Sequence, residues 1–598
     1  MNEFSRSIYA VISILLVGFV LIISRSSTSS SEITEDEIMG HIRYLSHENR
    51  EGRLPGTRGS KDVIAYLIKN LKSYGVRPAF GKSYTQPFNI QTGIQLGPLN
   101  NVIINKDTLV VQTDYLPLFF SANGNFSGEV VFAGYGFQIN EKELKWNDYE
   151  GIDVKDKWVI VMRHSPERDQ PHSIYAPHSP LHKKMIVAKD NGAKGIIFVS
   201  QIEDEELYPI KYVSGFKNNE APAIILSKNK ANQIFKRVGW STKKIQDEMN
   251  QTLKPLNFQL GILNFDATIN LEPVIKKGAN VVGEIRSRNR QYRDEYILIG
   301  AHFDHIGMGG VGSGSRLPNE YQVHPGADDN ASGTAGLLEL AQKLSSNINY
   351  LKRSVLFVGF DAEEKGLLGS KHFIESSPVK IENITTMINM DMIGRMSDSS
   401  YTVGGVGTSP LFEHLLDSLK KGRPFNLVMN KPGFGPSDHA TFYTKDIPVL
   451  FFFSGVHDEY HTPADTWQLI NLQGEKHILD YIYDLTYYLS RAPKRPAFQK
   501  AGPKEGQMGA PKKFKVSFGI VPSYSSTEKG LEVDGISRED GPAAKAGIIK
   551  GDVIKAINEK PVNDIYEYMD RLSTLKKGVT VPVLIERENK EIVLEVTF

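Results

Sequence analysis

The chain has 598 residues, which is too long for one hydrophobic core and predicts about three or four domains. Lys and Arg number 70 against 69 Asp and Glu, so no net basic field favours nucleic acid, and we expect no nucleic-acid partner. Cysteine is absent, which excludes disulfides, thiol nucleophiles and cysteine metal ligands.

The N-terminal stretch predicts export. Arg6 precedes an apolar run from Ile8 to Ile23, and Arg25 and a serine-rich stretch follow it. The run lies between the length of a signal-peptide core, about 7–15 residues, and that of a spanning helix, about 20. Because no clear cleavage site follows, we expect residues 1–31 to be an uncleaved signal anchor, with a cleaved signal peptide as the alternative. Either interpretation predicts a periplasmic or cell-surface protein, and the first tethers it to the membrane through residues 8–23.

The rest of the chain divides by its sequence pattern. Residues 32–95 show helical apolar spacing on both sides of a loop rich in Gly, Pro and Arg. Residues 96–275 contain short β-rich runs and one helical stretch, which predicts an inserted domain. In residues 276–492, apolar runs of strand length alternate with helical patterns, as is typical of an α/β domain with a mostly parallel mixed sheet flanked by helices. Residues 493–513 predict a flexible linker, and residues 514–598 a compact β-rich module.

Acidic and histidine residues follow the predicted strands of the α/β domain. Ligands of open α/β sheets bind beyond the carboxyl ends of the strands, so we expect these side chains to converge on one edge. Each of them has an ordinary alternative role, such as a helix dipole partner or a surface histidine, but their joint occurrence at strand ends favours a site. The residues are His302, Asp304, Glu363, Glu364, Asp391 and His461.

A pair of adjacent aspartates, Asp328 and Asp329, opens a helix in "HPGADDNASG". Adjacent like charges repel, so the pair needs a cation or strong donors nearby, although Asp329 could simply cap the helix. Zinc binds imidazole nitrogen and carboxylate oxygen at about 2.0–2.2 Å, and two zincs about 3.5–4 Å apart need a shared carboxylate. We therefore expect two zinc ions per chain, with one aspartate as the bridging ligand and the other as support.

Six motifs in the chain resemble those of the co-catalytic zinc aminopeptidases. They are "GAHFDHIG", "GADDNASG", "DAEEKGLLGS", "NMDMIGR", "SDHATF" and "YHTPADT". That family also includes glutamate carboxypeptidase II, the glutaminyl cyclases and the catalytically inactive transferrin receptor. The resemblance implies the zinc peptidase fold over residues 32–95 and 276–492.

The resemblance also implies a role for each residue. His302 and Asp391 would bind one zinc and Glu364 and His461 the other, while Asp328 would bridge them. Glu363 would be the general base that later protonates the leaving amine. Supporting roles fall to Asp304, Asp329, Asp438 and Asp465, with Asp304 behind His302, and a cis peptide is expected at Asp328–Asp329.

One position departs from the family pattern. Several members have a tyrosine just before the Ser-Asp-His motif that stabilises the tetrahedral intermediate, whereas this chain has Phe434. Phenylalanine has no hydroxyl, so the donor to the oxyanion is left open between Tyr460 and the metals alone.

The other two domains carry weaker resemblances. "VVFAGYGF", "WNDYEGIDVKDKWVIVMR" and "AKDNGAKGIIFVS" are similar to a protease-associated (PA) domain. "VSFGIVPSY" and "GPAAKAGIIKGDVIKAINEKPV" are similar to a PDZ domain. A PDZ domain would bind the C-terminus of a peptide, with loop N–H groups around Phe518, Gly519 and Ile520 taking the carboxylate. A structural β-domain without a ligand is the alternative.

Together these features predict an exported zinc-dependent aminopeptidase that removes N-terminal residues from peptides. A glutaminyl cyclase or a carboxypeptidase on the same fold is one alternative, and a non-catalytic receptor or scaffold is another. The presence of all the predicted ligands and of Glu363 argues against the non-catalytic interpretation.

Overall fold

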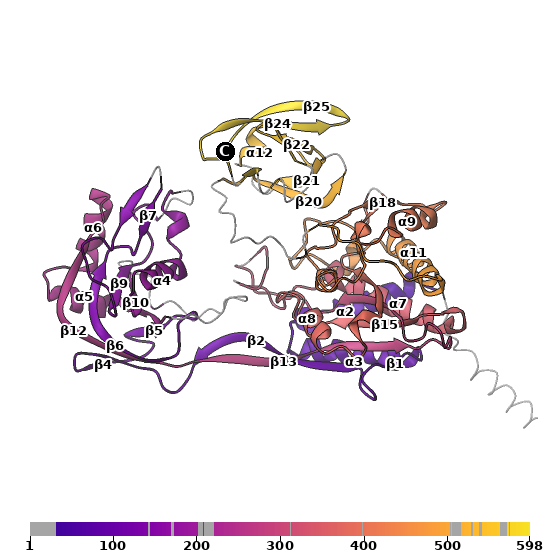
Figure 1. The fold of residues 1–598 in the computed structure, drawn as a ribbon, viewed down its shortest axis with the longest axis horizontal. Coiled ribbons are helices and arrows are strands. Elements are labelled where there is room, and N and C mark those ends of the chain that lie inside the picture. Colours follow the sequence, from indigo (N-terminus) through magenta and orange to yellow (C-terminus); the bar gives the residue numbers. More distant parts are fainter. Residues whose placement is uncertain are drawn as a thin grey trace, which may run out of the picture. The chain divides into compact units, whose positions relative to one another are not determined.

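The structure is a computed structural model of the chain. It describes residues 32–598 apart from gaps at 142–143, 169–172, 201–206, 208–220, 311, 318, 398, 503, 505–515, 528–529, 537–540, 563–567, 569–570 and 573. The predicted signal anchor, residues 1–31, lies outside the described residues. Asn89–Lys276 forms one compact unit, and the segments before and after it belong to another. Residues 32–88 and 277–502 form the peptidase-like part, residues 89–276 the inserted unit and residues 516–598 the C-terminal part (Figure 1).

The first part is built on a mixed sheet in the order β1-β13-β15-β14-β16-β19-β17-β18, with β2 paired to β13. Its central neighbours β15, β14, β16 and β19 are parallel, and β13 and β17 join them antiparallel. The α/β class with a mostly parallel mixed sheet is thereby confirmed. The strands are β1 (Arg77–Pro78), β2 (Thr85–Leu96), β13 (Leu271–Ile285), β14 (Tyr296–His302), β15 (Ser354–Phe360), β16 (Ile384–Met390), β17 (Ser400–Gly404), β18 (Asn426–Met429) and β19 (Val449–Phe453).

Both faces of this sheet are covered, which explains why its central strands are apolar without alternation. Ile297 and Ile299 of β14 lie in one apolar cluster with residues of α2, α3, α7 and α11, whereas Leu298 lies in a second cluster with Phe373 of α8 and Phe442 of α10. Successive side chains of a strand point to opposite faces, so burial on both faces requires a continuous apolar run. The helices are α2 (Glu35–Leu45), α3 (Arg58–Ser73), α7 (Gly333–Ser346), α8 (Leu368–Glu375), α9 (Phe412–Lys420), α10 (His439–Tyr443) and α11 (Leu472–Arg491).

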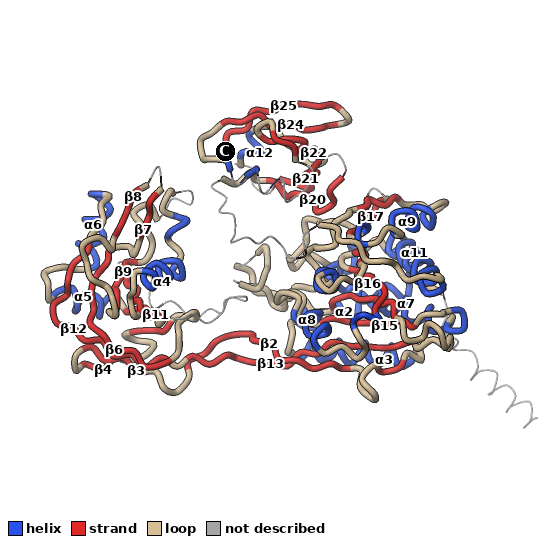
Figure 2. Tube along the Cα trace, viewed as in Figure 1, coloured by secondary structure: helices blue, strands red, loops and turns tan. Residues whose placement is uncertain are grey.

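The inserted unit is entered and left through β2 and β13, which pair with each other as a two-stranded ribbon (Figure 2). Its sheet has the order β4-β3-β12-β6-β9-β10-β11-β5, and β7 and β8 form a separate hairpin. The strands are β3 (Asn101–Ile104), β4 (Asp107–Leu109), β5 (Tyr115–Pro117), β6 (Gly124–Ala133), β7 (Gln138–Asn140), β8 (Lys145–Asn147), β9 (Trp158–Met162), β10 (Gly195–Val199), β11 (Ala223–Leu226) and β12 (Asn257–Ile269).

The helices of this unit correct one expectation. The predicted helical stretch forms α4 (Leu181–Asp190), but α5 (Lys228–Lys236) and α6 (Thr242–Thr252) are also present. Both have few apolar residues, and their buried side chains recur at helical spacing, such as Ile245 and Met249. A narrow apolar stripe of this kind gives a weak sequence signal.

The C-terminal part is a small β-rich module with the sheet order β20-β21-β22-β24-β25 and with β23 paired to β22. Phe518 is buried in its core, where its ring contacts Tyr568 and Phe598. Gly519 has a left-handed φ of 86°, and Ile520 begins β20. Its elements are β20 (Ile520–Thr527), β21 (Gly530–Ile536), α12 (Pro542–Lys545), β22 (Val553–Ile557), β23 (Lys560–Pro561), β24 (Thr580–Arg587) and β25 (Lys590–Thr597).

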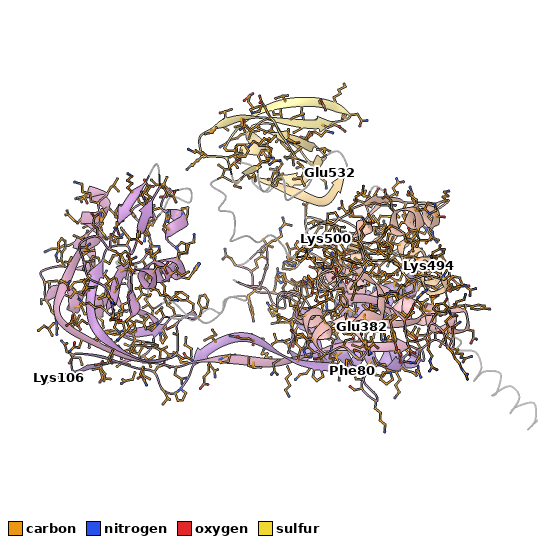
Figure 3. The ribbon with its side chains drawn as sticks, in the orientation of Figure 1. Phe80, Lys106, Glu382, Lys494, Lys500 and Glu532 are labelled. Carbon is orange, nitrogen blue, oxygen red and sulfur yellow. The ribbon has the colours of Figure 1, made fainter. Side chains whose placement is uncertain are left out.

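The first half of the predicted linker is bonded to the peptidase-like part rather than free. The N–H of Gln499 donates to the carbonyl of Thr408, and the Tyr443 hydroxyl accepts from the N–H of Ala501 (2.9 Å). Lys494 and Lys500 therefore lie on that part of the chain (Figure 3). Up to Gly502 the predicted linker is therefore hydrogen-bonded to this part of the chain, through main-chain contacts that its composition does not reveal.

No helix among the described residues is long and apolar enough to cross a membrane.

Candidate metal centre

The predicted site residues converge at one edge of the central sheet. Strand β14 ends at His302, while Glu364 follows β15 and Asp391 follows β16. Because β14 lies parallel to and between β15 and β16, their carboxyl ends meet at the same edge. His461 comes from the loop after β19. The structure therefore brings His302, Glu364, Asp391 and His461 together, as expected from the sequence.

One group of possible metal ligands consists of His302, Asp329 and Asp391. The Nε2 atom of His302 lies 3.3 Å from Oδ1 of Asp391 and 3.4 Å from Oδ1 of Asp329. The Nδ1 atom of the same ring lies 3.3 Å from the main-chain carbonyl of Asp304. A carbonyl only accepts, so Nδ1 carries a proton, and Nε2, which faces the two carboxylates, is the nitrogen that would bind a metal ion.

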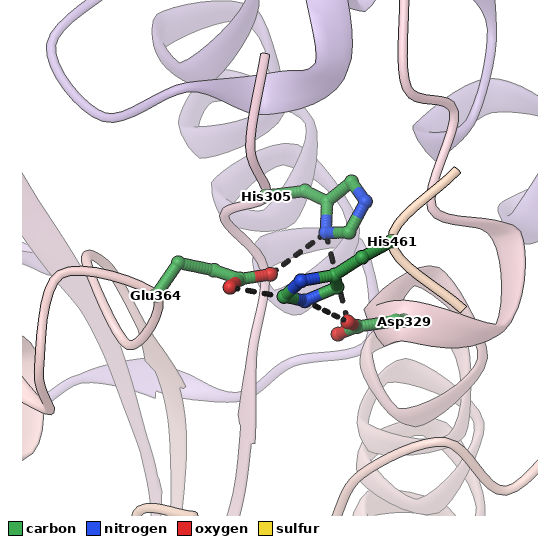
Figure 4. Close-up of side chains that lie close together, drawn as sticks. All are labelled: His305, Asp329, Glu364 and His461. Atoms are coloured by element: carbon green, nitrogen blue, oxygen red, sulfur yellow. Dashed lines mark hydrogen bonds and ion pairs between the residues drawn. The ribbon is translucent and has the colours of Figure 1, made fainter. Parts of the chain in front are cut away.

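A second group consists of His305, Asp329, Glu364 and His461, whose side chains point toward a common centre (Figure 4). Nε2 of His461 lies 3.1 Å from Asp329 and 3.3 Å from Glu364, and Nδ1 of His305 lies 2.8 Å from Glu364. Nδ1 of His461 lies 2.9 Å from the carbonyl of Gly314, so Nδ1 again carries a proton and Nε2 is the nitrogen that would bind a metal ion. His305 was not predicted as a site residue, although it is a second histidine three positions after His302.

Asp329, and not Asp328, is the carboxylate common to both groups. Oδ1 of Asp328 instead accepts from the N–H of Gly394 (2.7 Å) and from the hydroxyl of Ser332 (3.0 Å), and its Oδ2 lies 3.3 Å from Nε2 of His457. The assignment of the bridge to Asp328 and of support to Asp329 is therefore reversed by the geometry. The chain turns sharply between these neighbours, so their side chains point to different sides.

The turn that presents Asp329 is held from both ends. It is an irregular helical turn, Ala327–Ser332, that begins at Gly326 with a left-handed φ of 55°. A Cβ at Gly326 would lie 2.1 Å from the carbonyl of Asp329 and 2.6 Å from Cδ2 of His305, so only glycine fits. The carboxylate of Asp465 accepts from the N–H groups of Asp328 and Asp329, each at 3.1 Å. The cis peptide lies at Asp329–Asn330, one position after the expected one.

Asp304 joins two of the ligand loops. Its Oδ1 and Oδ2 accept from the N–H groups of Glu363 (2.9 Å) and Glu364 (3.4 Å), and its Oδ1 lies 3.7 Å from Nδ1 of His302. Asp304 thus supports mainly the loop after β15 rather than His302. Glu363 belongs to neither ligand group among the described residues. Burial, together with the charges of Asp438 and Glu364, raises the pKa of Glu363 well above its usual range, although His302 opposes this.

The remaining predicted residues lie around this centre. Asp438 is buried, and burial raises its pKa to about 7. Phe434 packs against the apolar cluster of α8 and α10 and offers no hydroxyl. The ring of Tyr460, in contrast, stacks on that of His461 at 4.0 Å. Burial and the nearby acids, Asp329 first, raise the pKa of Tyr460, so its hydroxyl stays protonated at neutral pH.

Arg53, a buried arginine near the N-terminal end of the described residues, connects the loops that carry the ligands, and its role is not predicted from the sequence. Arg53 is 0% exposed, and its guanidinium donates to main-chain carbonyls. The acceptors are Phe303 (2.7 Å), Leu45 (3.0 Å), Pro325 (2.5 Å), Gly326 (2.9 Å) and Asp329 (3.3 Å). These bonds hold the loop after β14 and the turn before α7 to the same guanidinium.

The donor set fits zinc. Ligands at about 2.0–2.1 Å from a tetrahedral ion lie about 3.3–3.4 Å from one another, and the contacts of both groups fall between 2.8 and 3.8 Å. The acidic side chains of the two groups also favour positive charge on the histidines beside them. Although burial lowers the pKa of His461, Asp329 and Glu364 raise it to about 11. A divalent ion would supply that charge in place of the proton.

Comparison with known proteins agrees with this geometry. Residues 280–486 match peptidase family M28, and residues 523–598 match the PDZ domain. The α/β domain with its paired ligand groups is thus similar to peptidase family M28, and a segment similar to the PDZ domain follows it in the same chain. The resemblance drawn from the six motifs is confirmed.

Individual relatives cover the chain to different extents. Aminopeptidase YwaD of Bacillus subtilis is 26% identical over 249 residues, which cover 39% of this chain and 49% of that protein. The probable lipoprotein aminopeptidase LpqL of Mycobacterium tuberculosis is 26% identical over 442 residues, or 71% of this chain and 75% of that protein. The chain thus spans about half of the first relative. The solved aminopeptidase from Aneurinibacillus sp. strain AM-1 is 20% identical, with coverage of 78% and 97% and a TM-score of 0.44.

Proposed function

We propose that this protein is a zinc-dependent aminopeptidase that binds two metal ions. The observation that carries the proposal is that two ligand groups share Asp329 while Glu363, a ligand of neither, lies beside them. His302 and Asp391 would hold one ion, and Glu364 and His461 the other, with Asp329 between them. Bound zinc ions would act as Lewis acids there and lower the pKa of water.

Glu363 would act as the general base. Its main-chain N–H is fixed on Asp304, and its raised pKa suits a group that first accepts a proton from water and then returns it to the leaving amine. The Glu363→Gln variant keeps the size of the side chain but not the proton acceptor. We expect it to bind zinc normally and to lose about 10²–10⁴-fold in turnover. Turnover within threefold of the unmodified protein would remove Glu363 from this role.

Tyr460 would donate a hydrogen bond to the substrate carbonyl as negative charge develops on its oxygen. Its ring lies against the predicted ligand His461, and Phe434 cannot take this role. We expect Tyr460→Phe to keep its zinc content and lose about 10²–10³-fold in kcat, as removal of an oxyanion donor does. An unchanged kcat would leave stabilisation to the metals alone.

The side chains next to the metal groups favour an apolar N-terminal residue in the substrate. Met392 follows Asp391 directly, and it forms an apolar cluster with Phe451 and Phe453 of β19 against which Tyr460 packs. Burial of an apolar side chain against such a surface stabilises the complex by about 25 cal/mol per Å². Leucine or phenylalanine substrates should therefore be preferred over lysine or aspartate.

The other segments suggest where the enzyme acts. The apolar run from Ile8 to Ile23 supports export and attachment to a membrane. The loop at Phe518, Gly519 and Ile520 supports binding of a peptide C-terminus by the PDZ domain. The sequence of residues 96–275 supports a PA domain that covers the cleft or selects substrates.

The proposal is tested with the purified protein and matched peptides that have either free or acetylated N-termini. Products are identified by mass spectrometry with and without a chelator. We expect stepwise loss of N-terminal residues from the free peptides alone, abolished by the chelator and restored by zinc. Cleavage of C-terminal residues, or cyclisation of N-terminal glutamine without hydrolysis, would replace the proposal by one of its two enzymatic alternatives.

A further inference from the structure

The two ligand groups of the metal centre are unequal. Among the described residues, one group offers three donors and the other offers four, and the difference is His305. The roles proposed above use neither ring nitrogen of His305, yet its side chain is 0% exposed and faces the acids of the second group.

The distances from His305 to the acids fit a metal ligand as well as those from His461 do. Its Nδ1 lies 2.8 Å from Oε1 of Glu364 and 3.8 Å from Oδ2 of Asp329, while the corresponding contacts of His461 are 3.3 and 3.1 Å. These values lie around the edge length of about 3.3–3.4 Å for a tetrahedral zinc site. The two imidazole rings meet edge to face at 5.5 Å, so both can approach one ion without a clash.

The surroundings fix the ring in this orientation. The main-chain N–H of His305 donates to the carbonyl of Arg53, which holds the backbone. Gly326 lies directly against the ring, because a Cβ there would lie 2.6 Å from Cδ2 and 2.8 Å from Cγ. A side chain held this closely has lost its rotamer freedom before any metal binds, and preorganised ligands bind more tightly.

We propose that His305 is a fourth protein ligand of the metal ion held by Asp329, Glu364 and His461. This site is then closed by protein, as structural zinc sites are, whereas the His302, Asp329 and Asp391 site keeps an open position. The closed site binds a divalent cation of the zinc type more tightly and fills first. This inference rests on the proposed two-metal function and adds to it an order of loading and a division of labour.

The rival interpretation is that Nδ1 of His305 only donates a hydrogen bond to Glu364 and orients it. A hydrogen-bonding partner of a ligand also affects metal affinity, by about 10–100-fold, so affinity alone does not separate the two roles. The number of imidazoles bound to the first metal does separate them.

The test uses the full-length protein, stripped of metal and reloaded with one equivalent of Zn²⁺. Zinc K-edge X-ray absorption counts the imidazole ligands, and titration against a coloured chelator gives the two affinities. We expect two imidazoles on the first zinc, from His305 and His461, and two well-separated binding phases. In His305→Ala the first zinc should have one imidazole, and the tight phase should weaken at least tenfold.

His324→Ala is the matched control. His324 is also fully buried near this centre, but both its nitrogens are engaged, with Ser315 Oγ and the carbonyl of Gln322, each at 2.9 Å. Both phases and the imidazole count should be unchanged in this variant.

A single imidazole on the first zinc of the unmodified protein overturns the proposal without any variant, so misfolding of His305→Ala cannot obscure the answer. Two equal binding phases overturn the order of loading. Absence of peptide hydrolysis by the fully loaded protein would instead refute the proposed function while leaving the coordination of His305 intact.

Discussion

Replacement of Arg53 by methionine should loosen the metal centre although Arg53 contacts no predicted ligand side chain. The guanidinium donates to five main-chain carbonyls, which belong to the loop after β14, the turn before α7 and the end of α2. Burial lowers the pKa of Arg53 to about 10, and the charges of Asp329 and Asp465 oppose this, so the side chain is charged at neutral pH. Methionine keeps the length of the side chain and removes every donor.

The magnitude follows from the bonds that are lost. Each hydrogen bond to a charged group contributes about 1.5–3 kcal/mol, and a buried carbonyl without a donor costs about 1–3 kcal/mol. These contributions are not additive, and the methionine variant avoids the cost of desolvating the guanidinium. We therefore expect the free energy of unfolding to fall by about 3–5 kcal/mol, as for other broken buried charge networks. At about 2–4 °C per kcal/mol this lowers the unfolding temperature of the peptidase-like part by about 6–20 °C. Zinc affinity should fall about 10–100-fold because the ligand loops lose their common support.

Calorimetry and chelator competition on the intact protein measure both effects. Arg58→Met is the control, because its side chain is 68% exposed and its ion pair among the described residues is with Glu51. A surface change of this kind stays within about 0.5 kcal/mol. If Arg53→Met left both the unfolding temperature and the zinc affinity unchanged, the guanidinium would not be what holds the loops together.

Two further predictions concern charge. Asp329→Asn should weaken zinc binding at both sites, because this side chain is common to both ligand groups. Asp328→Asn keeps the oxygen that accepts from Gly394 and should leave both zinc affinities nearly unchanged. The reverse pattern in chelator competition would restore Asp328 as the bridge. In the inserted unit, burial lowers the pKa of Lys184 from 10.5 to about 7, while its Nζ donates to the carbonyls of Met162 and His164. Between pH 7 and 10.5 the unfolded chain therefore binds a proton that the folded unit does not, so stability should rise with pH in this window. Lys184→Met should remove this part of the slope, and equal slopes in urea unfolding of both proteins would contradict the assignment.

The sequence predicted which side chains come together where the signal was a buried strand, but not where it was a turn. Strands β14, β15 and β16 are continuous apolar runs because both their faces are covered, and their order in the chain placed His302, Glu364 and Asp391 at one edge. Asp328 and Asp329 stand next to each other, and the backbone of the turn that begins at Gly326 decides which of them enters the site. No periodicity encodes that choice.

Arg53 and His305 escaped prediction for another reason. Arg53 ends a short, kinked 3-10 helix (Glu48–Arg53), and its partner Phe303 is 250 residues away in sequence, so no local pattern predicts the contact. His305 follows the end of β14 and therefore falls outside the strand pattern that selected His302. Both residues act through tertiary contacts between segments that lie far apart in the chain.

The different orientations of Asp328 and Asp329 explain how the fold accommodates so many acidic residues at one edge of the sheet. Asp328 turns toward donors that the protein itself supplies, the N–H of Gly394 and the hydroxyl of Ser332, and so needs no ion. Asp329 turns the other way, among Glu364 and Asp391, where Arg53 donates to its main-chain carbonyl and the histidines of the two groups lie against the carboxylates. Buried carboxylates in such numbers must be neutralised by protons or by cations. Nδ1 of His302 and of His461 each lie against a main-chain carbonyl, and Nε2 of each ring faces these acids, so Nε2 is the atom at which a metal ion would replace the proton.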